Sequence, residues 1–292
     1  MDRTVSIRFY SVEHPNGGGL GFSACLDQLN DLDLEERELE VADDIVLRLE
    51  RYNPQPRYVI GEVLRRQSQN LPSRAPRGRS AQRLGVGSIG HSSVFLYDSN
   101  LSILAIQIGR NGITAGRFVK YVSSVLDVPE FQALPVIKRD AWELLQRSNL
   151  RSIQVKVASP EDLAAAEGAA GGVRDGLIAL KEVARSAFVE ATLGMSHGDR
   201  DLPRNRVMNI LRYLVREKDE DRGGIKKVKA RIVPDGEGQA EFLNILEAQM
   251  GDSRTLELPD DEPNASYDIR AEFITRTYRA HLNILRQQFE AQ

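Results

Sequence analysis

The sequence has little of what several large protein classes require. It contains one cysteine, Cys25, in 292 residues, which excludes an internal disulfide and a zinc site built from several cysteines. Its apolar runs are a few residues long, whereas a membrane-spanning helix needs about 20. The opening residues, MDRTVSIRFYSV, hold no apolar segment followed by a small-residue cleavage site. We therefore expect a cytoplasmic protein without membrane insertion.

Catalytic signatures are absent as well. The sequence holds no phosphate-binding P-loop, no Gly-x-Ser-x-Gly elbow and no His-Glu-x-x-His metal motif. The segment GVGSIG at 85–90 precedes a predicted strand instead of opening a helix, so no helix N-terminus would receive a pyrophosphate. The four histidines are scattered: His14, His91, His197 and His281. We predict no catalytic residue, no cofactor and no metal ligand.

Charge is distributed unevenly, although the net charge is only −3 and the sequence pI is 5.9. Counting side chains gives −8 over residues 1–50, +7 over 51–83, +6 over 204–231 and −9 over 235–268. Blocks of opposite sign can neutralise one another in the fold or form a basic face opposite an acidic one. A DNA-binding domain is usually basic overall, with a pI above about 9. The acidic pI argues against a simple nucleic-acid-binding domain. The sequence leaves open a surface with one basic and one acidic face.

Hydrophobic periodicity predicts both strands and helices in the first half of the chain. Strands are expected at 4–12, 45–50, 57–68, 131–137 and 152–158, with a hairpin over 93–108. Helices are expected at 22–31, 115–126 and 140–148, and Thr114 is a candidate N-cap for the second of these. Residues 68–90 contain two prolines and four glycines without a hydrophobic period, which is typical of a long mobile loop.

The second half is predicted to be mostly helical. Helices are expected at 173–192, 204–217 and 268–290, interrupted by a strand at 225–233. Small residues and paired glycines over 159–172 indicate a linker. We therefore predict an α+β fold: an N-terminal domain, 1–158, with a mixed or antiparallel sheet and helices, and a helix-rich part, 173–292, with one short basic strand.

The strand at 225–233, IKKVKARIV, is the clearest candidate site. Period-2 alternation places Lys227, Lys229 and Arg231 on one face. Lys226 falls on the other, mostly apolar, face. Neighbouring cations on one strand face lie about 6.6 Å apart, a spacing suited to contacts with successive phosphates. These four side chains are predicted to bind DNA.

Two further groups of arginines are candidates for the same surface. On the helix 204–217, Arg212 and Arg216 lie opposite the apolar stripe and are predicted to extend the strand's surface. The loop region adds arginines, which suit bidentate phosphate contacts: Arg65, Arg66, Arg74, Arg77, Arg79 and Arg83. These cations can equally pair with the acidic blocks at 26–44 and 235–268, and the sequence leaves both alternatives open.

Four segments resemble the RexA-type phage-exclusion proteins and, more distantly, the KwaB-like anti-phage defence proteins. They are GHSSVFLYDSNLSILAIQIGRNGITAGRFVKYVSSVL, PVIKRDAWELLQRSNLRSIQVKV, GGIKKVKARIVPDG and AEFITRTYRAHLNILRQQF. The resemblance rests on element order and pattern, mostly from residue 90 onward. It implies DNA binding with little sequence preference, a homodimer and a role in phage exclusion or defence. Its lysine-rich segment carries over onto Lys226, Lys227, Lys229 and Arg231.

The first hypothesis is therefore a sequence-nonspecific DNA-binding protein that contacts duplex DNA through its phosphates and acts in phage exclusion or anti-phage defence. No aromatic residue lies among the loop arginines, so base stacking on a single strand is not indicated. An alternative is a protein-interaction component of a defence or toxin-type operon, whose interface is the stripe Ile274, Tyr278, His281 and Leu285 of the last helix. A third is a metal-dependent nuclease, with Gln154 and Lys156 on one strand face and Asp140 or Glu143 as metal ligands.

Overall fold

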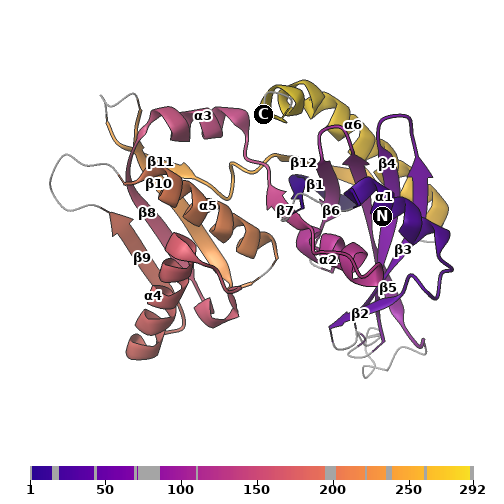
Figure 1. Cartoon of the computed structure of the whole chain (residues 1–292), viewed down its shortest axis with the longest axis horizontal. Helices are drawn as coiled ribbons and strands as arrows, with labels where there is room; N and C mark the ends of the chain where they lie inside the picture. Colours follow the sequence, from indigo (N-terminus) through magenta and orange to yellow (C-terminus); the bar gives the residue numbers. More distant parts are fainter. Residues whose placement is uncertain are drawn as a thin grey trace. The chain divides into compact units, whose positions relative to one another are not determined.

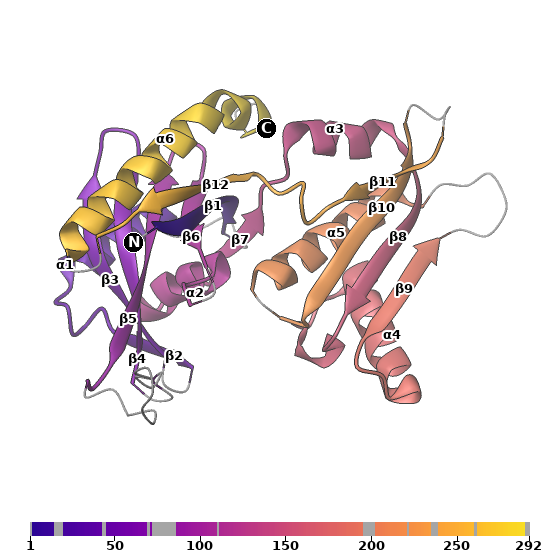
Figure 2. The same ribbon diagram turned by 180° about the vertical axis from the view of Figure 1, so that it is seen from behind.

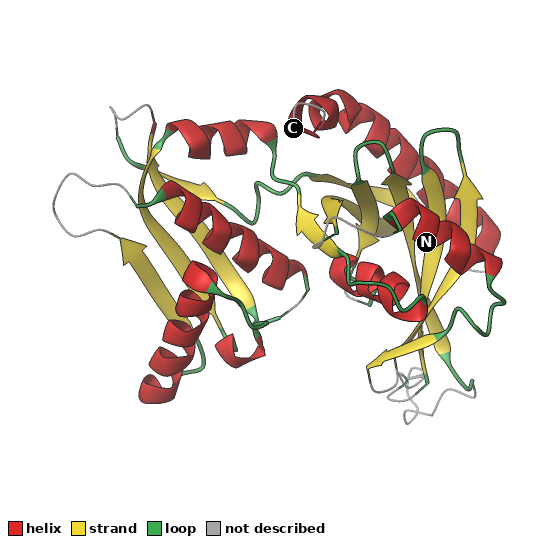
Figure 3. Cartoon of the chain, viewed as in Figure 1, coloured by secondary structure: helices red, strands yellow, loops and turns green. Residues whose placement is uncertain are grey.

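The computed structural model describes residues 2–14, 20–42, 45–68, 71, 86–109, 111–194, 202–220, 222–234, 239–259 and 262–289. Helices and strands occur in about equal amount, so the predicted α+β class is confirmed (Figures 1 and 3). The chain divides into two compact units: unit 1 comprises Met1–Ala133 and Gly251–Gln292, and unit 2 comprises Leu134–Met250. No helix among the described residues is long and apolar enough to cross a membrane.

Unit 1 is built on one large sheet with strand order β12-β1-β6-β5-β4-β3-β2, and β7 also pairs with β1. Neighbours in this order run antiparallel. The strands are β1 (Asp2–Glu13), β2 (Leu39–Ala42), β3 (Ile45–Pro54), β4 (Val59–Gln67), β5 (Ile89–Asp98), β6 (Ile103–Ile108), β7 (Gln132–Pro135) and β12 (Gly251–Glu257). The helices are α1 (Phe22–Asp31), α2 (Ala115–Val125) and α6 (Pro263–Phe289).

Helices cover both faces of this sheet because its central strands are apolar on both sides. On one face, α1 and α2 pack on alternate strand residues, and the rings of Phe95 and Phe118 lie 4.6 Å apart. On the other face, α6 contacts β5, β6, β1 and β4, and its His281 packs edge-on against Phe9 at 5.3 Å. Cys25 is buried in the first of these two layers, as expected of a structural thiol.

Unit 2 contains a second antiparallel sheet with strand order β11-β10-β8-β9 (Figure 1). The strands are β8 (Asn149–Val157), β9 (Val189–Gly194), β10 (Ile225–Val233) and β11 (Glu241–Asn244). The helices are α3 (Arg139–Arg147), the short η1 (Pro160–Asp162), α4 (Gly168–Ala184) and α5 (Arg204–Asp219). Strand β10 has the bounds predicted from the sequence, and its apolar face forms one core with α4 and α5.

The two units do not follow the division predicted from the sequence, because the segment 159–172 is packed inside unit 2. Both backbone polar groups of Ala164 form hydrogen bonds with side chains of α5. The Ala164 amide donates to Glu217 at 2.8 Å, and the Tyr213 hydroxyl donates to the Ala164 carbonyl at 2.7 Å. Beyond unit 2, β12 pairs with β1, so the end of the chain returns to unit 1.

The predicted helix 173–192 is also wrong in its second half. Helix α4 ends at Ala184, and Arg185 adopts the left-handed conformation with φ of 46°. The chain then forms β9, which pairs with β8. Because β9, β11 and β12 all follow residue 173, the C-terminal part is not helix-rich with a single short strand.

Candidate nucleic-acid interface

The face of the unit 2 sheet that does not contact α4 and α5 gathers polar side chains from all four strands. Residues directly opposite one another in antiparallel strands project to the same side. In the register of β10 and β8, Lys227 lies opposite Lys156, and Arg231 lies opposite Ser152. We call this surface the open sheet face, and its residues are Ser152, Gln154, Lys156, Glu190, Thr192, Lys227, Lys229, Arg231, Phe242 and Asn244.

The alternation of β10 explains why its cations face outward. Val228, Ala230 and Ile232 are fully buried in the core that includes Leu211 and Leu214 of α5. The side chains between them must point to the other side of the sheet. The prediction that Lys227, Lys229 and Arg231 share one face is therefore confirmed.

Lys226 does not follow this alternation. It was predicted to lie on the apolar face of the strand, yet the side chain is exposed. The register between β10 and β8 shifts between Ile225 and Lys227, which interrupts the alternation at Lys226.

Positive charge prevails on the open sheet face. Its single acidic residue is Glu190, whose carboxylate accepts from the Lys227 ammonium at 2.6 Å. That hydrogen bond, with the nearby charges of Lys227 and Lys156, lowers the pKa of Glu190. Among the described residues, no ion pair involves Lys229 or Arg231. A second carboxylate lies beside the face, since Glu247 accepts from the Asn244 amide group at 2.6 Å. Four cations against two carboxylates still leave a net positive surface.

Two exposed phenylalanines accompany these cations. Phe242 of β11 lies opposite Arg231 and is 51% exposed. Phe188, just before β9, is 47% exposed, and the Lys156 ammonium lies 3.8 Å from its ring centroid. The sequence interpretation missed both rings and assigned Lys156 only to the nuclease alternative. Alternation in IQVKV did signal the outward direction of Lys156, but which strands are neighbours is not visible from alternation.

The arginines of α5 do not extend this surface, so that part of the prediction is wrong. Helix α5 packs against the sheet of unit 2 (Figures 1 and 2). It contacts the apolar face that contains Val228 and Ala230, so it lies on the side opposite Lys229 and Arg231. The Arg212 guanidinium lies 4.6 Å from the Trp142 ring centroid, and Arg216 contacts Glu217 at 3.3 Å. Both arginines line a separate pocket of about 360 Å³.

Of the loop arginines, only Arg65 and Arg66 belong to the part of the chain that the structure describes. Arg66 forms an ion pair with Glu38 at 2.7 Å, as the charge-pairing alternative predicted. Arg65 donates to the Asn111 carbonyl at 3.0 Å, and burial together with the charge of Arg117 lowers its pKa. Both lie in β4 of unit 1, a different unit from β10. The remaining candidates lie outside the described residues: Arg74, Arg77, Arg79 and Arg83.

The residues proposed for a nuclease do not form a metal site. Gln154 and Lys156 do share a strand face, but Asp140 and Glu143 belong to α3, and Glu143 pairs with Arg139 at 2.5 Å. Across the described ranges no group of three His, Cys, Asp or Glu side chains is placed to hold a metal ion. The donor set therefore does not fit the metal that such an enzyme would need.

The stripe on the last helix is not available as an interface, contrary to the alternative hypothesis. Ile274, Tyr278 and Leu285 are buried within unit 1. His281 of the same stripe packs against Phe9 of β1. These side chains stabilise the unit's own core.

Comparison with known proteins places the chain in a family. The sequence profile described as "Family of unknown function (DUF6731)" matches residues 21–288, which include both units. The chain belongs to this family. No curated protein matches the sequence. For this DUF6731 protein the resemblance to RexA-type and KwaB-like proteins stays a prediction.

Proposed function

We propose that the open sheet face binds DNA through its phosphates, without reading the base sequence. The observation that supports this is the placement of Lys227, Lys229 and Arg231 on one face of the sheet, beside Lys156 of the neighbouring strand. Successive outward side chains of a strand are about 6.6 Å apart and neighbouring strands about 4.8 Å apart. A grid of cations at these separations can contact several phosphates of one DNA strand at once.

The sequence alone predicts duplex DNA, whereas the exposed rings of Phe188 and Phe242 favour single-stranded DNA. Every base has a π-face, so stacking on an aromatic side chain strengthens binding without selecting a sequence. Phe242 lies directly opposite Arg231, so one nucleotide can place its base on the ring and its phosphate near the guanidinium. In a duplex the bases are already stacked and cannot use Phe242.

The salt dependence of binding follows from the number of cations. With four phosphate contacts, the slope of log K against log salt is about −3.6 for duplex and about −2.8 for single strands. Replacing Lys227, Lys229 and Arg231 with alanine leaves Lys156 as the remaining cation. The magnitude of the salt slope then falls below about 1 for duplex and for single-stranded DNA.

The test is fluorescence anisotropy with labelled oligonucleotides of unrelated sequence, single-stranded and duplex, between about 50 and 200 mM salt. We expect the triple variant Lys227→Ala, Lys229→Ala, Arg231→Ala to weaken binding to every sequence equally. The matched control is Arg212→Ala with Arg216→Ala, which removes two cations from the other layer of the same unit. Undiminished binding by the triple variant, or equal weakening by the control, would overturn the proposal.

The role in phage exclusion and the homodimer are proposed on the resemblance alone. Cells that express the wild-type chain should reduce phage plaque numbers, and cells that express the triple variant should not. Sedimentation of the purified chain tests the homodimer separately. Plaque numbers that stay the same with either chain would leave DNA binding intact and remove the proposed part in phage exclusion.

A further inference from the structure

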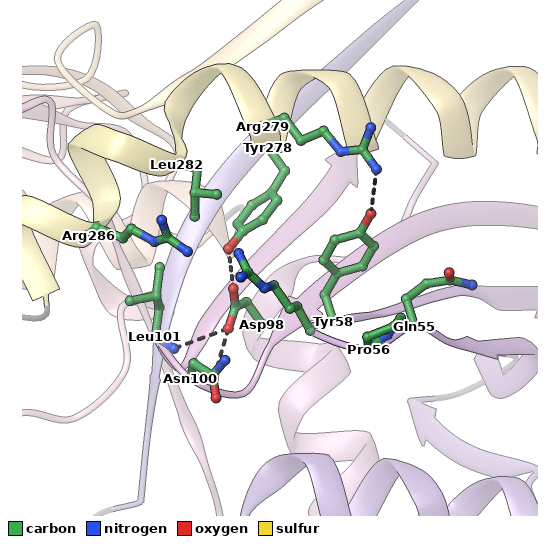
Figure 4. A pocket seen from close by; sticks show the side chains of 11 residues that line it. Gln55, Pro56, Tyr58, Asp98, Asn100, Leu101, Tyr278, Arg279, Leu282 and Arg286 are labelled. Carbon is green, nitrogen blue, oxygen red and sulfur yellow. Dashed lines mark hydrogen bonds between the residues drawn. The ribbon is translucent and has the colours of Figure 1, made fainter.

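Unit 1 contains a pocket that the open sheet face does not involve. It has a volume of about 390 Å³, within the range of small-molecule sites. Figure 4 shows it between α6, which contributes Tyr278, Arg279 and Arg286, and the turns that follow β3 and β5. We call it the arginine pocket, since Arg57, Arg279 and Arg286 all line it.

The only carboxylate in the lining, Asp98, has several neutral donors of its own. Asp98 is 4% exposed and accepts from the amides of Asn100 and Leu101 at 2.8 and 3.2 Å. Its second oxygen accepts from the Tyr278 hydroxyl, as the dashed lines in Figure 4 mark. Hydrogen bonds from these three neutral groups stabilise the buried Asp98 carboxylate.

The positive charge of the pocket exceeds this single negative charge. Arg279 donates to the Tyr58 hydroxyl at 3.1 Å, a neutral acceptor that does not offset the charge of the guanidinium. Arg57 is exposed in the turn between β3 and β4. Among the described residues, no ion pair involves Arg57 or Arg279, so these two guanidinium groups supply positive charge to the lining. Leu101 and Leu282 add apolar surface to the same lining.

We infer that the arginine pocket binds a small phosphorylated molecule, with Arg57 and Arg279 contacting the phosphate and Leu101 and Leu282 contacting its apolar or ring-shaped body. A guanidinium presents paired N–H groups that match phosphate oxygens. A phosphomonoester carries a charge of about −1.5 to −2 at neutral pH, which matches the two guanidinium charges of Arg57 and Arg279. The inference is independent of DNA binding, because every lining residue belongs to unit 1.

Calorimetric titration of the full chain tests this site with four phosphate probes: inorganic phosphate, phenyl phosphate, glucose 6-phosphate and adenosine monophosphate. Succinate serves as a dicarboxylate of equal charge. We expect at least one ester to bind more tightly than inorganic phosphate and than succinate, because the apolar lining contributes only with an organic body. The ester that binds most tightly shows whether the organic group attached to the phosphate is a plain aromatic ring, a sugar or a nucleoside.

Variants assign the binding to the pocket. Arg57→Met with Arg279→Met should weaken ester binding roughly tenfold or more, since two charge-assisted contacts are lost. Arg276→Met is the matched control, because Arg276 is exposed on the same helix and does not line the pocket. The single variant Arg57→Met keeps the test usable should the double variant not fold. Saturable binding by none of the esters, preference for succinate, or equal weakening by Arg276→Met would overturn the inference.

Discussion

Arg270 of α6 and Glu62 of β4 form an ion pair at 2.7 Å in which each side chain is only 7% exposed. Arg51 donates to the other oxygen of Glu62 at 2.9 Å, and Arg270 also donates to Gln107 at 3.2 Å. The pair joins the last helix of the chain to a strand of its first quarter. It is one reason why α6 belongs to unit 1 although all of unit 2 separates them in sequence.

Replacing Arg270 alone should strongly destabilise unit 1. Arg270→Met leaves Glu62 buried with Arg51 as its remaining partner, and breaking a buried pair costs about 3–5 kcal/mol. The double variant Glu62→Leu, Arg270→Met removes both buried charges and should recover most of the loss. Urea unfolding of the three proteins measures the difference. Equal instability of the single and double variants would mean that shape, not the unpaired charge, matters at this position.

A second prediction concerns the one carboxylate of the open sheet face. Glu190→Gln abolishes the ion pair with Lys227 and raises the net charge of the face by one. Binding to DNA should become tighter, because the Lys227 ammonium no longer exchanges a carboxylate for a phosphate, and the salt slope should stay near the value for four contacts. Glu161→Gln is the matched control, because Glu161 pairs with Lys181 at the same 2.6 Å elsewhere in unit 2. Weaker binding by Glu190→Gln would show that the ion pair positions Lys227 for its contact.

Removing the ring of Phe242 should lower the affinity for single-stranded DNA but not the affinity for duplex DNA. Base stacking on an aromatic side chain is worth about 1–3 kcal/mol per base in single-stranded complexes. Phe242→Ala should therefore weaken single-stranded binding roughly tenfold and leave duplex binding nearly unchanged. Because Phe242 is 51% exposed, the substitution should not alter the stability of the unit. Equal loss for both forms of DNA would contradict a stacking role.

The individual elements were predictable from the sequence where local patterns determine them. Strand 225–233 and helix 22–31 have the predicted bounds, and Thr114 caps α2 by accepting from the Arg117 amide at 3.3 Å. None of these three predictions requires knowing which other segment lies beside the element. Periodicity and capping are properties of a few neighbouring residues.

Relationships between distant segments were not predictable in this way. Strand β12, GDSRTLE, is too polar to signal a strand, and it forms because its backbone pairs with β1 in the register Asp2 to Glu257. The insertion of unit 2 follows from that pairing. Likewise, the open sheet face depends on β8 lying beside β10, while the alternation of each strand shows only which of its residues share a side.

The pH dependence of stability should carry a contribution from Tyr213. Burial, followed by the charge of Glu217, raises the pKa of this phenol from its ordinary value near 10 to about 12. Between these values the unfolded chain releases the proton and the folded chain keeps it, so the free energy of unfolding falls as pH rises from 10 to 12.

Tyr213→Phe tests this contribution. At neutral pH the variant should be less stable by roughly 1–3 kcal/mol, because the Ala164 carbonyl loses its donor. Above pH 10 its stability should fall less steeply than that of the wild type. Urea unfolding at successive pH values compares the two slopes, and other tyrosines contribute equally to both proteins. Parallel curves would indicate that Tyr213 ionises normally in the folded state.

The last prediction is that the two units fold and act independently. Each has its own buried core, and the two ends of unit 2 run side by side, with the Met250 amide donating to the Val136 carbonyl at 2.7 Å. A chain in which a short Gly-Ser linker replaces residues 139–247 should therefore fold as unit 1. Circular dichroism and a cooperative melting transition measure this.

The separated units should divide the two binding activities. The shortened chain keeps the arginine pocket and should bind the phosphate ester as the full chain does, with no affinity for DNA. Residues 134–250 expressed alone keep the open sheet face and should bind DNA with the salt slope of the full chain. If the shortened chain folds and still binds DNA, the DNA-binding surface lies in unit 1 and the assignment to β10 is wrong.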